Sequence, residues 1–465
     1  MITARSLSPN GTGDVDGSGA AATPLEYVFG FVVIFLFQGA FFPLLRERSV
    51  ADTAAQLAQG NPIARAFQGI ALVVMVLIVV ARRKTMFPVI FRAQPFILII
   101  GICLVSALWS QDPFLTVRRS LSLMDCFLFG YYAFAVYGPR NTVRLLATGA
   151  IVAASASLML AVVAPHIAFE SGIRSDVGSL IGVFSQKNEL SVNILTGFCS
   201  CMYLGFIASN RSRFDRLVGW CTPIIILVLL LSHGLTSIIA SLFVSLSTIV
   251  FFAGIRSRLL LLGLYCVGAV ALVGVVATLM NPEMVFHFFG KDSTLTGRLP
   301  LWIDCLGAIK DRPLFGYGYS AFWLPGTIEA EYIWSRIGWY APSAHDGFLQ
   351  LALDIGLVGT CFYLFLITRL IQLTIRATRV GELSEARWVV LFLISMLIEN
   401  LDEGTLAWPD LLAAEVAFSA ALTETWWRSY VLKIRKNSRP ARFSTWSERF
   451  DMRSRASVSN IAHDA

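Results

Sequence analysis

The chain has 465 residues, of which 56% are hydrophobic and only 14% are charged. This composition excludes an ordinary soluble globular protein and predicts an all-α polytopic membrane protein. The net charge of +7 is spread in short basic groups between apolar runs, so it indicates membrane topology rather than a nucleic-acid partner.

Apolar runs of membrane-spanning length recur along most of the chain. Residues 1–24 are rich in Gly, Ser and Ala without an apolar core, which predicts a disordered cytoplasmic tail rather than a signal peptide. A single transmembrane domain is expected over 25–425, followed by a basic cytoplasmic tail over 426–465. About twelve spans are predicted, at 25–45, 63–81, 95–110, 120–138, 145–165, 189–208, 217–233, 236–254, 259–280, 346–367, 387–401 and 408–425.

The basic groups assign a side to each loop. If the amino terminus is cytoplasmic, every strongly basic short loop falls on the cytoplasmic side, as the positive-inside rule requires. These loops are 82–84, 139–144, 209–216, 256–258 and 369–387. Both termini are then cytoplasmic, and the long polar gap 281–345 lies on the opposite face.

The gap 281–345 is too short for an ordinary independent domain. Within it Leu301, Ile303, Leu306 and Ile309 recur at near-helical spacing, and Pro313 follows the run. This pattern predicts a short amphipathic helix on or near the outer membrane surface.

No nucleotide or metal signature occurs. The sequence has no Walker-type glycine loop and no paired-histidine zinc motif, and seven of the eight cysteines lie in apolar runs. Neither a metal nor a cofactor is expected. Such a chain can still catalyse if its substrate arrives activated, as a lipid-linked sugar diphosphate does.

A diphosphate needs cations, and Arg binds phosphate bidentately. On the outer side the candidates are Arg298 and Arg174, with Lys187 as a helper. The simpler interpretation is contact with lipid headgroups, or pairing with the neighbouring acids Glu170, Asp176 or Asp292.

His345 stands just before a span and beside Asp346. A histidine titrates near neutrality and can act as a general base oriented by a carboxylate. The alternative is an interfacial polar residue, and adjacent residues diverge along a helix, so Asp346 need not touch His345. The acidic turn with Glu399, Asp402 and Glu403 either binds sugar hydroxyls or is a solvated loop, and the second interpretation is favoured.

Four motifs in order resemble a known family. They are ALWSQDPFLTVRRSL, GVFSQKNELSVNI, DSTLTGRLPLWIDCLGAIKDRPLFGYGYSAFW and SAHDGFLQLALDIGLVG, within residues 107–121, 182–194, 292–323 and 343–359. Together they are similar to the O-antigen ligase and Wzy polymerase superfamily, and most of all to its ExoQ-type exopolysaccharide polymerases.

The resemblance implies a GT-C-like fold and a metal-independent, inverting glycosyltransferase of the bacterial inner membrane. Its donor would be an undecaprenyl-diphosphate-linked oligosaccharide at the periplasmic face. The family's catalytic loop histidine carries over to His345 and its diphosphate-binding arginines to Arg298 and Arg174. Asn188 and Asp346 are the candidates for binding or orienting the acceptor. A Wzz-like chain-length regulator and a flippase are the implied protein partners.

The sequence departs from the family pattern in two places: LSHGLTS (231–237) lacks the usual basic residue, and Leu299 replaces the frequent Thr after the Thr-Gly-Arg step. Three functions stay open. The first is polymerisation of lipid-linked repeat units, the second is ligation of the same donor to another acceptor, and the third is transport of lipid-linked sugars.

Overall fold

A computed structural model describes residues 22–45, 62–170, 178–252, 298–404 and 406–437. Within these ranges the regular structure is helical, apart from one isolated antiparallel bridge between Phe169 and Leu180. Six helical runs there are long and apolar enough to cross a membrane, or up to seven if the bent pair α4 and α5 counts as one span. The prediction of an all-α, multi-pass membrane protein is confirmed. The count of twelve spans and the GT-C-like architecture stay predictions.

The described helices follow the apolar runs of the sequence. The first half of the chain contains α1 (Pro24–Gln38), η1 (Phe42–Leu45), α3 (Pro62–Ala81), α4 (Arg83–Arg92), α5 (Gln94–Val105), η2 (Ser106–Leu108), α6 (Pro113–Tyr132), the π-helical turn η3 (Ala133–Tyr137), α7 (Gly138–Val163), α8 (Pro165–Ala168), α9 (Lys187–Met202) and the π-helical turn η4 (Tyr203–Ile207).

The second half contains α10 (Arg213–Trp220), α11 (Thr222–Leu231), α12 (Leu235–Phe252), α15 (Arg298–Asp311), α16 (Ile328–Ile337), α17 (Gly347–Val380), α18 (Ala386–Glu399) and α19 (Leu411–Asn437). The predicted span 259–280 and most of both predicted tails lie outside the described residues.

Helix α3 has the surface of a span that faces lipid. Only Ala71 and Met75 of its twenty residues are buried, whereas Val73 and Leu77 are 60% and 63% exposed. A helix that is apolar all round and largely uncovered would be insoluble in water but is stable against acyl chains.

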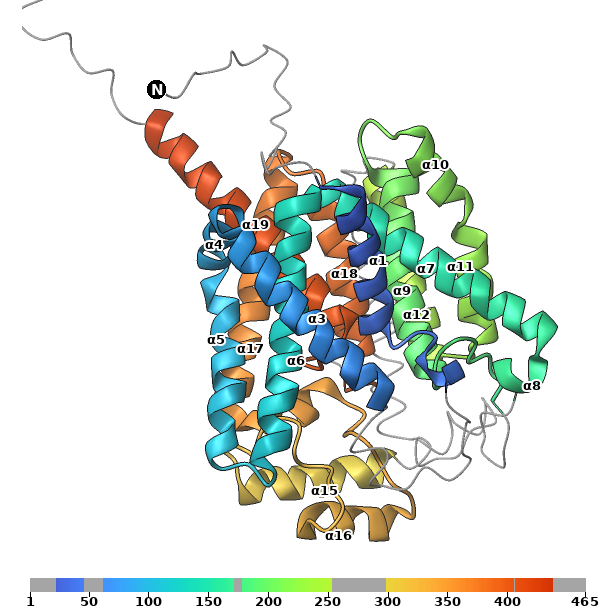
Figure 1. Cartoon of the computed structure of the whole chain (residues 1–465), viewed down its shortest axis with the longest axis vertical. Helices are drawn as coiled ribbons and strands as arrows, with labels where there is room; N and C mark the ends of the chain where they lie inside the picture. Colours follow the sequence, from blue (N-terminus) through green and yellow to red (C-terminus); the bar gives the residue numbers. More distant parts are fainter. Residues whose placement is uncertain (1–21, 46–61, 171–177, 253–297, 405, 438–465) are drawn as a thin grey trace, which may run out of the picture.

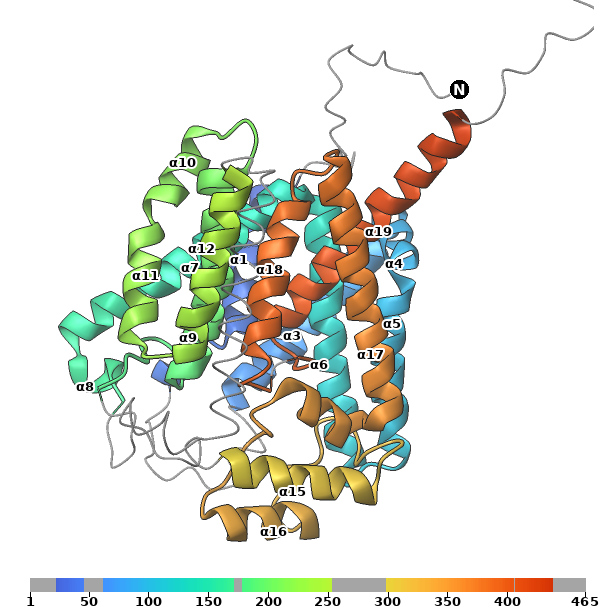
Figure 2. The ribbon, with the colours of Figure 1, turned by 180° about the vertical axis from the view of Figure 1, so that it is seen from behind.

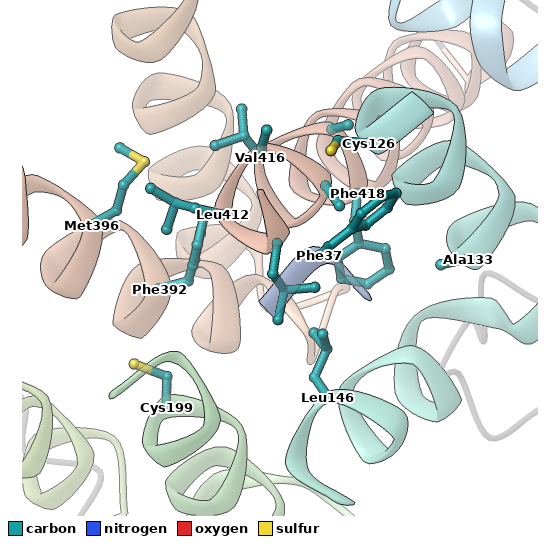
Figure 3. Packing of buried hydrophobic residues seen from close by; sticks show 14 of the residues in the cluster. Phe37, Cys126, Ala133, Leu146, Cys199, Phe392, Met396, Leu412, Val416 and Phe418 are labelled. Carbon is teal, nitrogen blue, oxygen red and sulfur yellow. The ribbon is translucent and has the colours of Figure 1, made fainter. Parts of the chain in front are cut away.

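The core of the bundle lies between α6, α7, α9, α18 and α19. Figure 3 shows Leu146, Phe392, Leu412 and Phe418 converging there from several of these helices. Helices α6 and α19 approach most closely at Gly130, where an added Cβ would lie 2.2 Å from the backbone oxygen of Ala414. Such small-residue contacts are how membrane helices gain packing energy without a hydrophobic driving force.

Helix α17 is broken at Gly356, which has φ 68° and ψ −178°. The break is filled by the turn 313–318: the N–H of Leu357 donates to Pro313 O at 2.8 Å, and the N–H of Tyr317 donates to Leu353 O at 2.8 Å. An added Cβ on Gly356 would lie 2.2 Å from Leu314 O. The turn 313–318 therefore docks into the break and fixes the short first half of α17, residues 347–355.

Helices α15 and α16 form a layer across one end of the bundle (Figures 1 and 2). We call residues 298–346 the end layer. The predicted helix is present as α15, but its buried face differs from the expected one. Leu301 and Ile309 are buried, as are Cys305 and Ala308, whereas Ile303 and Leu306 are 57% and 49% exposed.

Candidate functional site

Arg298 is the first residue of α15, and its guanidinium reaches the loop between α18 and α19. Nη1 donates to the backbone oxygen of Asp402 at 2.9 Å and also pairs with the Asp402 carboxylate. Nη2 lies 3.2 Å from Oε1 of Glu403. Since only 16% of its side chain is exposed, Arg298 is a largely buried cation between two carboxylates.

His345 lies in a turn that is fixed by hydrogen bonds at the residue before it. The N–H of Ala344 donates to Oε1 of Gln350 at 2.9 Å, and the indole of Trp302 donates to Ala344 O at 2.9 Å. His345 itself has φ 49°, a left-handed backbone that is uncommon for a non-glycine residue and persists only where the surroundings hold it. Because Trp302 lies one helical turn after Arg298, α15 connects the arginine to the histidine turn.

Glu403 joins these two side chains. Its Oε2 lies 3.4 Å from Nδ1 of His345, and its Oε1 contacts Arg298 and accepts a hydrogen bond from the side-chain amide of Asn188. The separation of 3.4 Å is long for a well-formed hydrogen bond. Catalytic hydrogen bonds are often long before substrate binds.

The surroundings of Glu403 keep it ionised. Burial alone would raise the pKa of its carboxyl, but the neighbouring His345 and Arg298 outweigh burial and lower the pKa below its usual value. Glu403 is therefore an anion at neutral pH, in spite of being buried. A carboxylate held at Nδ1 leaves Nε2 of the imidazole for substrate.

Asp346 has a different role from the one expected. Its Oδ1 accepts the backbone N–H groups of Phe348 and Leu349 at 2.9 and 2.8 Å, so it is the N-cap of α17. Burial raises the pKa of the Asp346 carboxyl, and the two N–H groups partly offset that rise. The carboxylate that faces His345 belongs to Glu403, which lies 58 positions further along the chain.

The remaining predicted residues lie as follows. Asn188 is in the cluster through Glu403, and Lys187 precedes it as the first residue of α9. Arg174 lies outside the described residues. The residue that sequence reasoning missed is Glu403, because the acidic turn was interpreted as a solvated loop. Glu399 and Glu403 are in fact buried, and only Asp402, with 38% of its side chain exposed, is partly solvated. The signal for this was three acids within five residues at the end of an apolar run.

The cluster brings together a base oriented by a carboxylate and a cation that can bind an anion. For a phosphate to reach Arg298, it has to replace a carboxylate, and the more exposed Asp402 is the partner that is easier to displace. Among the described residues, no group of three or more His, Cys, Asp or Glu side chains is arranged to hold a metal ion.

Comparison with known proteins matches part of this cluster to a family. Residues 221–364, which include α15, Arg298 and His345, match the family model described as O-Antigen ligase (Wzy_C). Glu403 and Asn188 lie outside the matched residues. That family comprises polysaccharide ligases and polymerases, whose substrates are in general lipid-linked and lie in the bilayer.

The chain is also similar to the exopolysaccharide production protein ExoQ of Rhizobium meliloti (strain 1021). The two are 26% identical over 266 residues, which span 55% of this chain and 59% of ExoQ. The aligned part is thus less than two thirds of the relative's length. The family resemblance predicted from the four motifs is confirmed, as an ExoQ-like membrane protein of the O-antigen ligase family.

Proposed function

We propose that this protein polymerises lipid-linked oligosaccharide repeat units during exopolysaccharide synthesis, at the periplasmic face of the bacterial inner membrane. The observation that carries the proposal is the contact of Glu403 with both His345 and Arg298, since it joins a general base and an anion-binding cation in one site. The similarity to ExoQ supports the assignment to exopolysaccharide production.

In the proposed reaction, Nε2 of His345 takes the proton from an acceptor sugar hydroxyl, while Glu403 holds the Nδ1–H and stabilises the imidazolium. The hydroxyl oxygen attacks the anomeric carbon of the donor glycan. A carbon–oxygen bond forms there as the bond to the phosphate oxygen breaks, and the electron pair leaves with the undecaprenyl diphosphate. A single displacement inverts the configuration at that carbon.

Arg298 stabilises the charge that develops on the departing diphosphate, because a preorganised cation is worth more in a partly buried site than in water. Arg174 and Lys187 are proposed as further phosphate contacts from the same face, and Asn188 as a residue that orients Glu403. The reaction needs neither nucleotide nor cofactor, since the donor carries its own leaving group.

The nearest alternative is ligation, with the same donor but another acceptor. A transporter or flippase of lipid-linked sugars is the alternative from a different class. Helix α15, whose first residue Arg298 contacts Glu403, lies at one end of the bundle (Figure 1), which favours a transferase over a mid-membrane transport site. A flippase and a Wzz-like chain-length regulator are proposed as its protein partners.

The test uses the purified full-length protein with the lipid-linked oligosaccharide that accumulates in a strain lacking it, without added nucleotide or divalent metal. Wild type should form a ladder of longer lipid-linked glycans. His345→Ala should lose about 10²–10⁴-fold in rate, because a positioned base contributes that much. Unextended repeat units with wild type would overturn the polymerase proposal. Transfer to a different acceptor would then support the ligase.

The cellular site of accumulation separates the transferase from the flippase. In a strain without the protein, a polymerase or ligase leaves repeat units on the periplasmic face of the inner membrane. A flippase leaves them on the cytoplasmic face, so accumulation there would contradict the proposal.

A further inference from the structure

One tryptophan of the end layer differs from the other three. The indole N–H of Trp302 donates to Ala344 O, that of Trp323 to Gln350 Oε1 and that of Trp334 to Ala341 O, each at 2.9 Å. These three side chains hold the layer together. Trp339 is half-buried, and among the described residues its indole N–H has no hydrogen-bond partner. Its conformation is therefore not explained by the polar network that fixes its neighbours.

The ring of Trp339 lies next to the candidate base. Helix α16 ends at Gly338, whose φ of 78° turns the chain sharply. The following residue is thereby brought to His345, with the ring centroids 5.7 Å apart and the planes tilted by 50°. Glu403 contacts Nδ1 of the same imidazole. His345 is thus flanked by an aromatic ring and by a carboxylate.

This pairing matches the two kinds of surface on a sugar. The C–H groups of a pyranose face pack on an aromatic ring, whose face carries partial negative charge. The hydroxyl groups at the rim of the same sugar need hydrogen-bonding groups, such as the imidazole of His345 and the hydroxyl of Ser343, which accepts from the His345 N–H at 3.3 Å. An indole beside a base therefore suits a sugar whose hydroxyl is to be deprotonated.

We infer that Trp339 is the platform on which the acceptor sugar of the transfer reaction stacks. The inference rests on the proposed function and assigns the acceptor to the Trp339 side of His345, with the diphosphate of the donor at Arg298. The acceptor belongs on this side because the sugar that contacts the base is the one that loses the proton. Trp339 also packs on the apolar cluster of the end layer, together with Trp302, Ile337 and Leu349, so a purely structural role has to be separated by experiment.

The experiment measures donor and acceptor separately with the full-length protein in detergent. The donor is the lipid-linked oligosaccharide from the deletion strain, and the acceptor is the same oligosaccharide released from its lipid diphosphate. Trp339→Ala should raise the acceptor KM about tenfold, the size expected for a lost aromatic contact. The donor KM and the kcat at saturating acceptor should change little. Trp339→Phe should restore most of the acceptor affinity.

Tyr332→Ala is the matched control. Tyr332 is an aromatic residue of the end layer that is 56% exposed, and its ring contacts Arg336 rather than His345. This variant should leave both KM values unchanged.

Each outcome decides one question. If wild type transfers no glycan to any acceptor, the proposed function itself fails. If wild type is active and Trp339→Ala keeps its acceptor KM, or loses kcat and thermal stability together without a change in KM, Trp339 is only a packing residue and the inference is overturned.

Discussion

Two carboxylates at different ends of the bundle each contact two basic side chains, and they differ in how tightly these are held. Asp215 of α10 is fully buried, and its oxygens accept from Arg144 Nε at 2.7 Å and from Arg140 Nη2 at 3.0 Å. The backbone N–H of Ser212 adds a further contact at 2.8 Å. The contacts of Glu403 with basic side chains are longer, at 3.2 Å to Arg298 and 3.4 Å to His345, although its Oε1 also accepts from the Asn188 amide at 2.5 Å. Figure 1 places α10 and α15 at opposite ends.

The difference separates two kinds of ion pair. A structural ion pair only stabilises the fold, whereas an exchangeable one has partners that substrate can replace. The Asp215 cluster is a capping box at a helix start whose carboxylate is saturated by fixed donors. The cluster at Glu403 includes a histidine, a partly exposed second acid and long distances, so its partners can be replaced by substrate.

After the loss of His345, the largest expected effect is at the cation of the exchangeable cluster, Arg298. Arg298→Ala should lower the rate of polymer formation about 10²–10³-fold, because a preorganised charge contact to the leaving group is lost. The rate is measured with the lipid-linked oligosaccharide at saturation. Near-normal polymer from this variant would remove Arg298 from the site, and Arg298→Lys should recover only part of the activity since the bidentate contact is absent.

Glu403→Gln should have the next largest effect on rate. A neutral amide holds the imidazole in place but does not stabilise the imidazolium, and loss of the equivalent charge in a catalytic triad costs up to about 10⁴-fold in kcat. Given the longer contact here, we expect a fall of about 10²-fold in kcat. Asp346→Asn is the matched control, since an asparagine N-cap serves α17 nearly as well. Equal losses in both variants would contradict the role of Glu403 as the orienting carboxylate.

Asp215→Asn should affect the stability of the protein rather than its rate of turnover. It leaves two arginines without their carboxylate, and we expect it to cost about 2 kcal/mol of stability. Turnover of the folded protein should be that of wild type. Thermal unfolding in detergent, measured beside the activity assay, checks both statements. A large loss of turnover without loss of stability would mean that the Asp215 cluster is not merely structural.

The smallest effect is the pH dependence of stability at Glu403. Its folded-state pKa lies below the usual value of 4.5, so its contacts contribute in full above that pH and are lost as the pH falls through the lower folded-state pKa. The difference in apparent Tm between wild type and Glu403→Gln should therefore be constant near neutral pH and shrink in acid. A difference that grows in acid would show that the pKa of Glu403 is raised.

The sequence predicted an all-helical membrane protein correctly, because long apolar runs leave the chain no other structure in a membrane, whereas the count of twelve spans stays a prediction. It also singled out Arg298 and His345, which lie 47 positions apart and meet at one carboxylate. That carboxylate could not be chosen from the sequence, since the partner of a side chain in a distant loop depends on tertiary packing. Asp346 looked like the partner by proximity, yet the N–H groups at the start of α17 compete for it successfully.

The face of α15 was ambiguous for a related reason. Apolar residues occur around much of this helix, and the periodicity of Leu301, Ile303, Leu306 and Ile309 does not distinguish the side that packs on α17 from the side that faces outward. The interruption of α17 at Gly356 could not be predicted from the sequence either, because a glycine within an apolar run is compatible with an unbroken helix.

The break at Gly356 separates the first nine residues of α17, next to His345, from the rest of the helix. Membrane-spanning helices change their tilt when bilayer thickness changes. An unbroken helix would transmit that movement to the residues at its end. Here the hydrogen-bond ladder of α17 is interrupted, and the N–H of Leu357 bonds to Pro313 instead. The residues before the break and those after it are instead both hydrogen-bonded to the turn 313–318, so the end layer as well as the span positions the part of α17 next to His345.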